Sequence, residues 1–367
     1  MSSSDLHAPQ RILVIRYKAI GDVLLTSVIC NSLKRSFPNA QVDYLTYEIS
    51  AGLYKGHPFI DNVLAITKAE QKNPLKYFFK AKKVVAKKYD IIIDAASTHK
   101  SQLISLLARK TAVRIGRKNK HKNRVFTNLV DESSEGGKDK TLQRLLMLNP
   151  LKEMGYDIVD DDQMTLTIET HLKEQIRQAM LESGVDFNRP IFAFSVTSKR
   201  GYKKWDESYM VELATHCLKE YGAQLILFSG SSDESEDIQQ FQKKMNNHVD
   251  IHSGIQTKSI VDLAAVLSHC DFFVGNEGGA RHISQALKIS SLAIFSPSAA
   301  KAVWLPNESD DYQGIECQDV IEIAADINQK IKHRDNWTSG VYQEYYKKIK
   351  PEEVIRRVDL MIKKIRL

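Results

Sequence analysis

The sequence predicts an α/β protein composed of two Rossmann-like domains, each built around a parallel sheet. Strand-like and helix-like segments alternate along the first half of the chain, and the same alternation starts again at Pro190. The continuous apolar run at residues 91–93 is typical of a strand that is buried on both faces of its sheet. A length of 367 residues also exceeds one ordinary domain and suggests two of similar size.

The first half supplies the elements of the first domain. Residues 12–15 predict a strand, and residues 42–45 predict the strand that follows the Pro38-Asn39 turn. Between them, apolar residues recur at helical spacing. These residues are Leu25, Val28, Ile29, Leu33 and Phe37.

The second half repeats this pattern with clearer helix boundaries. Residues 191–194 and 225–228 predict strands. Asp206 is expected to cap the helix between them, which stops at Gly222. We expect an N-terminal domain over residues 1–175 and a C-terminal domain over residues 176–345. A basic amphipathic helix over residues 346–367 is expected to pack back on the N-terminal domain.

Composition excludes several classes of protein. No run approaches the ~18 apolar residues of a membrane span, and the first ten residues lack the apolar core of a signal peptide, so we expect a cytoplasmic protein. The four cysteines form no C-x-x-C pair, and no histidine cluster has ligand spacing. We read Asp160-Asp161-Asp162 as a solvated turn, and expect neither a metal nor another cofactor.

The net charge of +7 is unevenly distributed. Residues 68–124 hold seventeen Lys or Arg and three acids, a patch that suits an anionic polymer or a phosphorylated membrane surface. We interpret four lysines as the solvated face of a helix whose apolar side is Phe78, Phe79, Val84 and Val85. These lysines are Lys76, Lys80, Lys83 and Lys87. Residues 109–124 are too dense in charge for such a face, so we expect them to bind an anion. The residues concerned are Arg114, Arg117, Lys118, Lys120, Lys122 and Arg124.

The most informative motif is the glycine turn at residues 274–282, which lies between a predicted strand and a predicted helix. Such a turn lets a ligand approach the backbone, and the first N–H groups of the helix point at it. The turn predicts a phosphate site, although a tight turn without a ligand would have the same sequence. Glu277 and His282 flank it and suit sugar hydroxyls.

Other polar residues follow predicted strands, where α/β sheets bind ligands. Asp22 comes after the first strand and a glycine; it is either a catalytic base or an ordinary helix cap. Asp233 and Glu234 are placed to accept hydrogen bonds from ribose hydroxyls or to cap the next helix. Lys100 and Ser101 follow the strand at residues 91–94 and suit an anionic acceptor.

Four segments together resemble a known family. Residues 11–16, residues 20–26, Lys203-Lys204-Trp205 and residues 275–282 resemble, in this order, the bacterial lipopolysaccharide heptosyltransferases of glycosyltransferase family 9. The resemblance implies a GT-B fold, in which two Rossmann-like domains face a central cleft. It also implies inverting transfer of heptose from ADP-heptose to the inner core of lipopolysaccharide. Leu25-Thr26 and residues 45–48 are most similar to the branch that adds a third heptose.

The resemblance assigns roles to individual residues. Asp22 matches the family's general base, and Lys203 matches the lysine that contacts the donor's phosphates. Residues 277–282 match the family's Asp-Thr-Gly-x-x-His turn with two departures, because Glu277 replaces Asp and Gly278 lacks the threonine hydroxyl. The expected donor site comprises Lys203, Thr197, Ser198, Asp233, Glu234, Glu277, Gly278, Gly279 and His282.

The resemblance also implies the partners of the protein. The acceptor is a lipid-linked anionic oligosaccharide, and the enzyme contacts the cytoplasmic face of the inner membrane peripherally. The expected acceptor site comprises Lys100, Ser101, Arg114, Arg117, Lys118 and Lys120.

Two other functions stay open at the level of sequence. One is a GT-B transferase that uses a UDP- or GDP-linked sugar. The other is a nucleic-acid-binding protein, which is disfavoured because the aromatic residues of the basic segment have the spacing of core residues. A nicotinamide dehydrogenase is also disfavoured, because no G-x-G-x-x-G motif follows the first strand.

Overall fold

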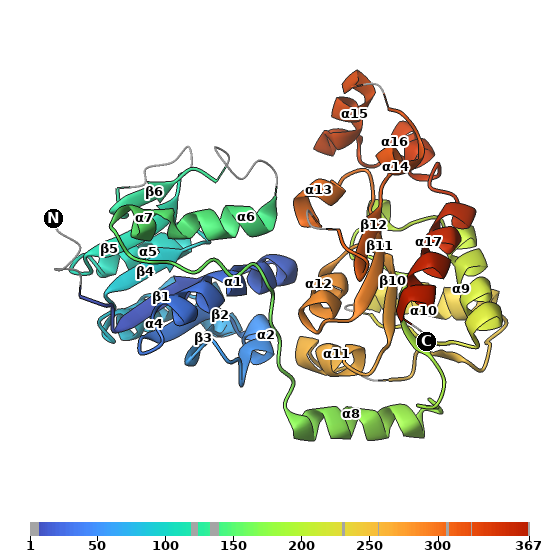
Figure 1. Ribbon diagram of the computed structural model, residues 1–367, viewed down its shortest axis with the longest axis horizontal. Helices are drawn as coiled ribbons and strands as arrows, with labels where there is room; N and C mark the ends of the chain where they lie inside the picture. Colours follow the sequence, from blue (N-terminus) through green and yellow to red (C-terminus); the bar gives the residue numbers. More distant parts are fainter. Residues whose placement is uncertain are drawn as a thin grey trace. The chain divides into compact units, whose positions relative to one another are not determined.

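The computed structural model describes residues 7–118, 124–132, 139–229, 232–255, 257–305, 308–323 and 325–365. The chain divides into two compact units, Met1–Glu169 and Thr170–Leu367, which we call unit 1 and unit 2. The observed division lies six residues before the boundary expected from sequence. Each unit contains its own parallel sheet and helices on both faces of that sheet (Figure 1).

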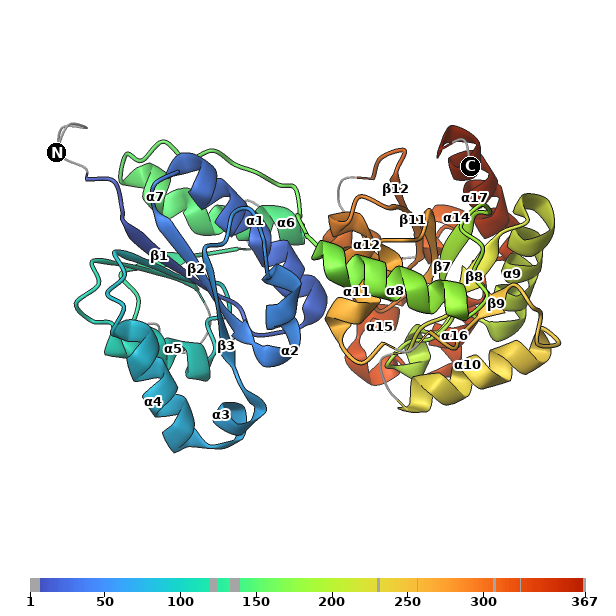
Figure 2. The ribbon, with the colours of Figure 1, turned by 90° about the horizontal axis from the view of Figure 1, so that it is seen from below.

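Unit 1 contains a six-stranded parallel sheet of order β3-β2-β1-β4-β5-β6. Its strands are β1 (Arg11–Ile15), β2 (Gln41–Tyr47), β3 (Asn62–Ile66), β4 (Ile91–Asp94), β5 (Val113–Arg117) and β6 (Asn128–Val130). Its α-helices are α1 (Ile20–Ser36), α2 (Glu48–Ala51), α3 (Lys68–Lys72), α4 (Pro74–Val85), α5 (His99–Leu107), α6 (Lys140–Leu145) and α7 (Asn149–Glu153). Helices α1, α6 and α7 lie on one face of the sheet, and α4 and α5 lie on the other (Figure 2).

Unit 2 repeats this topology, with the sheet order β12-β11-β10-β7-β8-β9. Its strands are β7 (Ile191–Ser195), β8 (Gln224–Ile226), β9 (Ile251–His252), β10 (Phe272–Asn276), β11 (Ser290–Ile294) and β12 (Tyr312–Ile315). Its longer helices are α8 (Thr170–Glu182), α9 (Glu207–Tyr221), α10 (Ser232–Lys244), α11 (Ile260–Leu267), α12 (Gly279–Ala286), α15 (Ala325–Lys332) and α17 (Pro351–Ile365). Shorter helices are η3 (Gly201–Lys203), α13 (Lys301–Trp304), α14 (Cys317–Val320) and α16 (Gly340–Tyr346).

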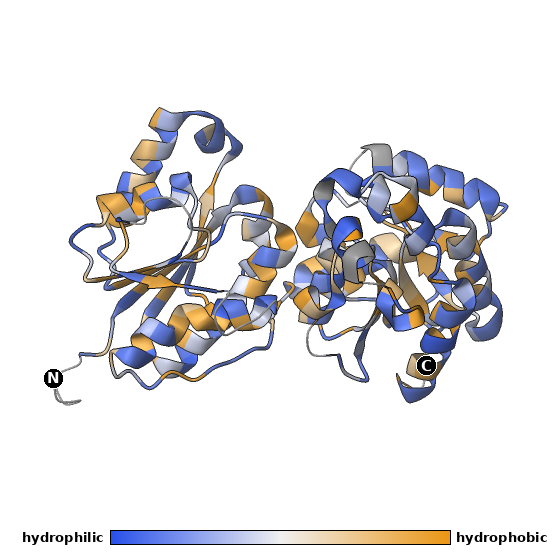
Figure 3. Ribbon diagram, turned by 90° about the horizontal axis from the view of Figure 1, so that it is seen from above, coloured by the Kyte–Doolittle hydropathy of each residue, from blue (hydrophilic) through white to orange (hydrophobic). Residues whose placement is uncertain are grey.

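The two sheets confirm the predicted α/β class and the two Rossmann-like sheets. The helices of both units show mixed hydrophilic and hydrophobic segments (Figure 3), whereas β1, β4 and β7 consist mostly of buried apolar residues. The predicted boundaries of α9 are also observed, because the Asp206 side chain accepts a hydrogen bond from the Ser208 N–H at 2.9 Å. Gly222 ends the helix with a left-handed φ of 58°, a conformation that glycine adopts without strain.

Helix α17 packs within unit 2, whereas the sequence analysis expected it to pack on the N-terminal domain. Its apolar residues Val354, Val358 and Met361 belong to the same buried cluster as Met210 and Leu213 of α9. The amphipathic pattern predicted a buried face, but it carried no information about which surface covers that face. No described helix has the length and apolarity needed to cross a membrane.

Candidate active site

Each sheet reverses its strand order at one point, and the candidate site residues gather there. The reversal lies between β1 and β4 in unit 1 and between β7 and β10 in unit 2. In open parallel sheets, ligands bind beyond the carboxyl ends of the strands at such a point. Arg16 and Ala95 follow β1 and β4, and the Arg16 guanidinium donates to the Ala95 carbonyl at 2.7 Å.

Asp22 lies in the first turn of α1 and does not cap it. The N-cap residue is Ala19, and no side chain accepts a hydrogen bond there. The Asp22 carboxylate instead pairs with Arg16 at 2.8 Å and with Arg144 at 2.9 Å. Its side chain is 18% exposed, so the carboxylate remains accessible. The structure therefore excludes the cap interpretation, and the catalytic role stays a prediction.

Arg144, which the sequence analysis did not single out, joins Asp22 to a larger arginine–carboxylate cluster. The side chain of Arg144 is only 1% exposed and also contacts Glu132 at 2.6 Å. Glu132 in turn pairs with Arg117 at 2.6 Å. The cluster comprises Arg16, Asp22, Arg117, Glu132 and Arg144, and so holds three guanidinium groups and two carboxylates.

Electrostatics keep Asp22 ionised. Burial alone would raise the pKa of Asp22, but the adjacent Arg16 and Arg144 guanidinium groups outweigh burial and lower it. Asp94, at the end of β4, behaves in the opposite way, because complete burial raises its pKa to about 6 despite hydrogen bonds from the Ser97 and Ala96 N–H groups. Burial and the charge of Arg144 lower the pKa of the nearby Lys140.

The other acceptor residues expected from sequence have intramolecular partners. Lys100 Nζ donates to the Gln71 carbonyl at 2.7 Å, and the fully buried Ser101 forms a capping box with Thr98. The Arg114 guanidinium donates to the Val125 carbonyl at 2.9 Å and to other backbone carbonyls. Among the described residues expected to bind the acceptor, only Arg117 joins the Asp22 cluster. Lys118 pairs with Asp131 at 3.5 Å, while Lys120 and Lys122 lie outside the described residues.

In unit 2, the predicted glycine turn joins β10 to α12. Gly275 has a φ of +129°, and a Cβ atom there would lie 2.4 Å from the Ser195 carbonyl oxygen of β7, so the position requires glycine. Gly278 precedes α12 in an extended conformation, and no side chain caps the helix. The first N–H groups of α12 are therefore available to a ligand such as phosphate.

Lys203 and Glu277 meet at this turn. The Lys203 ammonium pairs with the Glu277 carboxylate, whose side chain is 8% exposed. The neighbouring Lys204 pairs instead with Asp237 of α10 at 2.8 Å. The different carboxylate partners distinguish the two lysines, a distinction that the sequence could not make. Because Glu277 directly follows β10, Lys203 lies at the carboxyl end of that strand.

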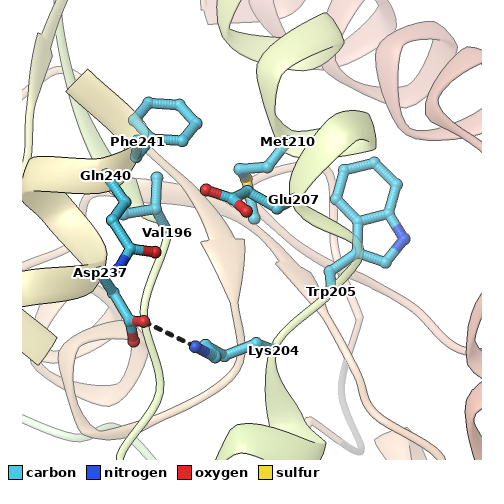
Figure 4. A pocket seen from close by; sticks show the side chains of 8 residues that line it. All are labelled: Val196, Lys204, Trp205, Glu207, Met210, Asp237, Gln240 and Phe241. Atoms are coloured by element: carbon cyan, nitrogen blue, oxygen red, sulfur yellow. Dashed lines mark hydrogen bonds and ion pairs between the residues drawn. The ribbon is translucent and has the colours of Figure 1, made fainter. Parts of the chain in front are cut away.

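Lys204 lines a pocket of unit 2 (Figure 4). The pocket lies between the start of α9 and one side of α10, and Val196 follows β7 into it. It is lined by Val196, Lys204, Trp205, Glu207, Met210, Asp237, Gln240 and Phe241. The Lys204–Asp237 ion pair crosses it, so Lys204 is engaged by α10.

Arg281 and His282 are buried behind the turn. Arg281 is fully buried, and burial lowers its pKa to about 10 while Glu277 acts in the opposite direction. Its guanidinium donates to the Trp304 carbonyl at 2.9 Å and to Gln285 at 2.7 Å. Burial and the charge of Arg281 hold the pKa of His282 far below its ordinary value, so His282 is neutral. The Glu277 carboxylate thus interacts with two cations, the Lys203 ammonium and the buried Arg281 guanidinium.

The remaining donor residues lie at the same edge of the sheet. Thr197 and Ser198 follow β7, and the Thr197 carbonyl accepts from the Asn276 side chain at 3.4 Å. Asp233 and Glu234 lie in the first turn of α10, and the Asp233 side chain is outside the described part. No group of three or more His, Cys, Asp or Glu residues in the described ranges could hold a metal ion.

Comparison with known proteins identifies the family. The sequence model of glycosyltransferase family 9 (heptosyltransferase) matches residues 79–318. The chain is 25% identical over 294 residues to lipopolysaccharide heptosyltransferase 3 of Escherichia coli, covering 75% of this chain and 80% of that protein. It is 22% identical over 361 residues to lipooligosaccharide heptosyltransferase 2 of Haemophilus influenzae, covering 96% and 99% of the two chains.

Solved structures agree in fold. A family 9 glycosyltransferase from Veillonella parvula superposes with a TM-score of 0.78 at 18% identity, covering 96% of this chain and 97% of that chain. An E. coli heptosyltransferase in complex with ADP-2-deoxy-2-fluoro heptose superposes with a TM-score of 0.67 at 17% identity, covering 95% and 99%. Because the family model spans more than half of the sequence, the chain belongs to glycosyltransferase family 9, the heptosyltransferases.

Proposed function

We propose that this protein transfers heptose from ADP-heptose to the inner core of lipopolysaccharide, with Asp22 as the general base. The observation that carries the proposal is the Asp22 carboxylate, which is ionised, accessible and not used as a helix cap. The E. coli relative named lipopolysaccharide heptosyltransferase 3 supports addition of the third heptose. The ADP-heptose analogue bound to a structural neighbour supports the donor.

Inverting transfer requires a base at the acceptor hydroxyl and a positive environment at the departing diphosphate. In this proposal Asp22 removes the hydroxyl proton as the oxygen attacks the anomeric carbon of heptose, and the bond from that carbon to the ADP oxygen breaks. The N–H groups at the start of α12 and the Lys203 ammonium stabilise the negative charge that develops on ADP.

The arginine–carboxylate cluster supports an anionic acceptor. The cluster has three guanidinium groups but only two carboxylates, so it carries an excess of positive charge. Lys140 lies nearby, and burial and the charge of Arg144 lower its pKa. We therefore assign the acceptor's acidic groups to this cluster, with Arg117 retained from the sequence analysis. Because the acceptor is lipid-linked, we also propose that the enzyme works peripherally at the cytoplasmic face of the inner membrane.

Asp22→Asn tests the base. The amide keeps the shape of the carboxylate but cannot accept the proton, so we expect kcat to fall by at least ~100-fold. ADP affinity should change little, because ADP is assigned to unit 2. The measurement is heptose transfer from ADP-heptose to purified core oligosaccharide, with UDP- and GDP-sugars as donor controls.

Glu132→Gln is the matched control, because it removes the other carboxylate of the cluster, which pairs with Arg117 and shares Arg144 with Asp22. It should reduce turnover far less than Asp22→Asn does. Equal losses in both variants would show that the charge balance of the cluster, rather than proton transfer by Asp22, sets the rate. Turnover of Asp22→Asn within a few-fold of the parent would exclude Asp22 as the base.

A further inference from the structure

Helix α4 of unit 1 exposes large apolar side chains instead of burying them. Tyr77, Ala81 and Val84 face the sheet and are buried. Leu75 and Phe79, one helical turn apart, are 64% and 60% exposed. The sequence analysis expected Phe79 on the buried side; it lies two positions after Tyr77 and therefore points almost the opposite way around the helix. Helix α4 lies on the outside of its unit (Figure 2).

Lysines surround this exposed stripe. Helix α4 contains four lysines and no acidic residue. By helical geometry, Lys76 and Lys83 lie on one side of Leu75 and Phe79, and Lys82 lies on the other. Lys82 also rests over the Phe78 ring at 5.2 Å. None of the four α4 lysines forms an ion pair within the described ranges, and Lys76, Lys82 and Lys83 are exposed.

The basic segment that follows differs in this respect. The guanidinium of Arg114 is satisfied by backbone carbonyls, and that of Arg117 pairs with the buried Glu132. The guanidinium groups of these two arginines therefore have hydrogen-bond or ion-pair partners within the fold. The ammonium groups of the α4 lysines instead lie beside an exposed apolar surface and form no ion pair within the described ranges.

This arrangement fits the surface of an anionic bilayer. Exposed Phe and Leu side chains can enter the boundary between headgroups and acyl chains, and lysine ammonium groups at their sides meet lipid phosphates. A second copy of this chain is a poor occupant, since two α4 faces would bring lysines against lysines. A protein partner would need an acidic rim around an apolar pocket.

We propose that the outward face of α4, centred on Leu75 and Phe79 and flanked by Lys76, Lys82 and Lys83, docks the enzyme on anionic lipid. The proposal rests on the proposed function in one respect, namely that the acceptor is held in a membrane. It assigns that contact to one helix, and the contact requires no insertion of backbone into the bilayer.

Vesicle co-sedimentation tests the docking surface. The vesicles contain equal parts of phosphatidylcholine and phosphatidylglycerol, with phosphatidylcholine alone as the lipid control. The parent should bind the anionic vesicles, and added salt should weaken that binding. Leu75→Ser with Phe79→Ser, and separately Lys76→Gln with Lys83→Gln, should each weaken it by about tenfold or more. These side chains are exposed, so circular dichroism should show an unchanged fold.

A matched variant in unit 2 controls for general loss of charge and apolar surface. Leu360 of α17 is 50% exposed and precedes Lys363 and Lys364. Leu360→Ser with Lys363→Gln and Lys364→Gln should bind the vesicles as the parent does. Equal losses in the α4 and α17 variants, or parental binding by the α4 variants, would overturn the proposal. Sedimentation velocity gives a further test. If the α4 substitutions change the oligomeric state of the protein but not its binding to vesicles, α4 is a self-association surface and the proposal is wrong.

Transfer to a delipidated core oligosaccharide separates this proposal from the proposed function. The α4 variants should retain parental kcat and KM with that soluble acceptor. If the parent binds vesicles through α4 but transfers no heptose, the proposed function fails and the docking surface stands. If transfer occurs and vesicle binding is insensitive to α4, the docking surface fails alone.

Discussion

Single residues at the sheet edge of unit 1 have opposite acid–base properties. Asp22 is ionised because two guanidinium groups face it, which makes it a weak base that is always available at neutral pH. Asp94 is fully buried, and burial outweighs the hydrogen bonds that it accepts. The fold therefore stabilises one carboxylate as an anion and destabilises the other.

The raised pKa of Asp94, about 6, predicts a pH-dependent cost of folding. In the unfolded chain Asp94 ionises near its ordinary pKa of 3.8, so the folded state loses stability as the pH rises from there through 6. Asp94→Asn removes this titration. Its stability relative to the parent should increase by about 2 kcal/mol between about pH 4.5 and about pH 8.

Urea unfolding of Asp94→Asn and the parent at the two pH values measures this difference. Other groups titrate equally in both proteins, so the comparison isolates Asp94. A stability difference between variant and parent that is the same at both pH values would show that Asp94 is not destabilised by burial.

At the scale of elements, the β10–α12 turn combines one obligatory glycine with one replaceable glycine. Gly275 is fixed by its positive φ and by the Ser195 backbone. Gly278 is extended, and a Cβ atom there would have no heavy atom within 4 Å. By resemblance, the family has threonine at this position. The open space shows that a hydroxyl side chain fits here without disturbing the turn.

We therefore expect Gly278→Thr to bind ADP about two- to tenfold more tightly than the parent, through one hydrogen bond to a phosphate oxygen. Gly278→Val has the same shape without the hydroxyl and should show no gain. Isothermal titration calorimetry with ADP gives both affinities. Identical affinities of the threonine and valine variants would place position 278 away from the phosphates.

For the whole molecule, local sequence signals predicted the architecture well. Apolar periods, caps and glycine stops act over a few residues, and they predicted both parallel sheets and the ends of α9. They could not predict contacts between distant residues. Arg144 lies 122 positions from Asp22, and its role depends on the folded sheet. The sequence showed that Lys100 and Arg114 are positively charged, but it could not show whether each side chain binds a ligand or a backbone carbonyl.

The same limit applies to α4. Its composition predicted an amphipathic helix, but which side faces the sheet depends on a rotation that Tyr77, Ala81 and Val84 set through tertiary packing. Asp22 and Glu277 were singled out by their places after predicted strands, and the family resemblance then assigned roles to Asp22 and Lys203. The structure then distinguished Lys203 from Lys204 by their different carboxylate partners.

The division into two compact units predicts that ADP stabilises only one of them. All three tryptophans, Trp205, Trp304 and Trp337, lie in unit 2, so tryptophan fluorescence reports the unfolding of the unit assigned to the donor. At an ADP concentration of about 100 times Kd, binding adds about 2.7 kcal/mol to the stability of that unit. For a domain of this size, the fluorescence-detected Tm should rise by roughly 5–10 °C.

Far-UV circular dichroism, which follows both units, should retain a component that ADP does not shift. In Lys203→Ala the ADP-induced shift should fall by at least half, while any shift with adenosine stays unchanged, because the ammonium acts on the phosphates alone. A single transition that moves as a whole in both signals would show that the units unfold together. An unchanged tryptophan transition at saturating ADP would show that unit 2 does not hold the donor, and the phosphate site at the start of α12 would have to be abandoned.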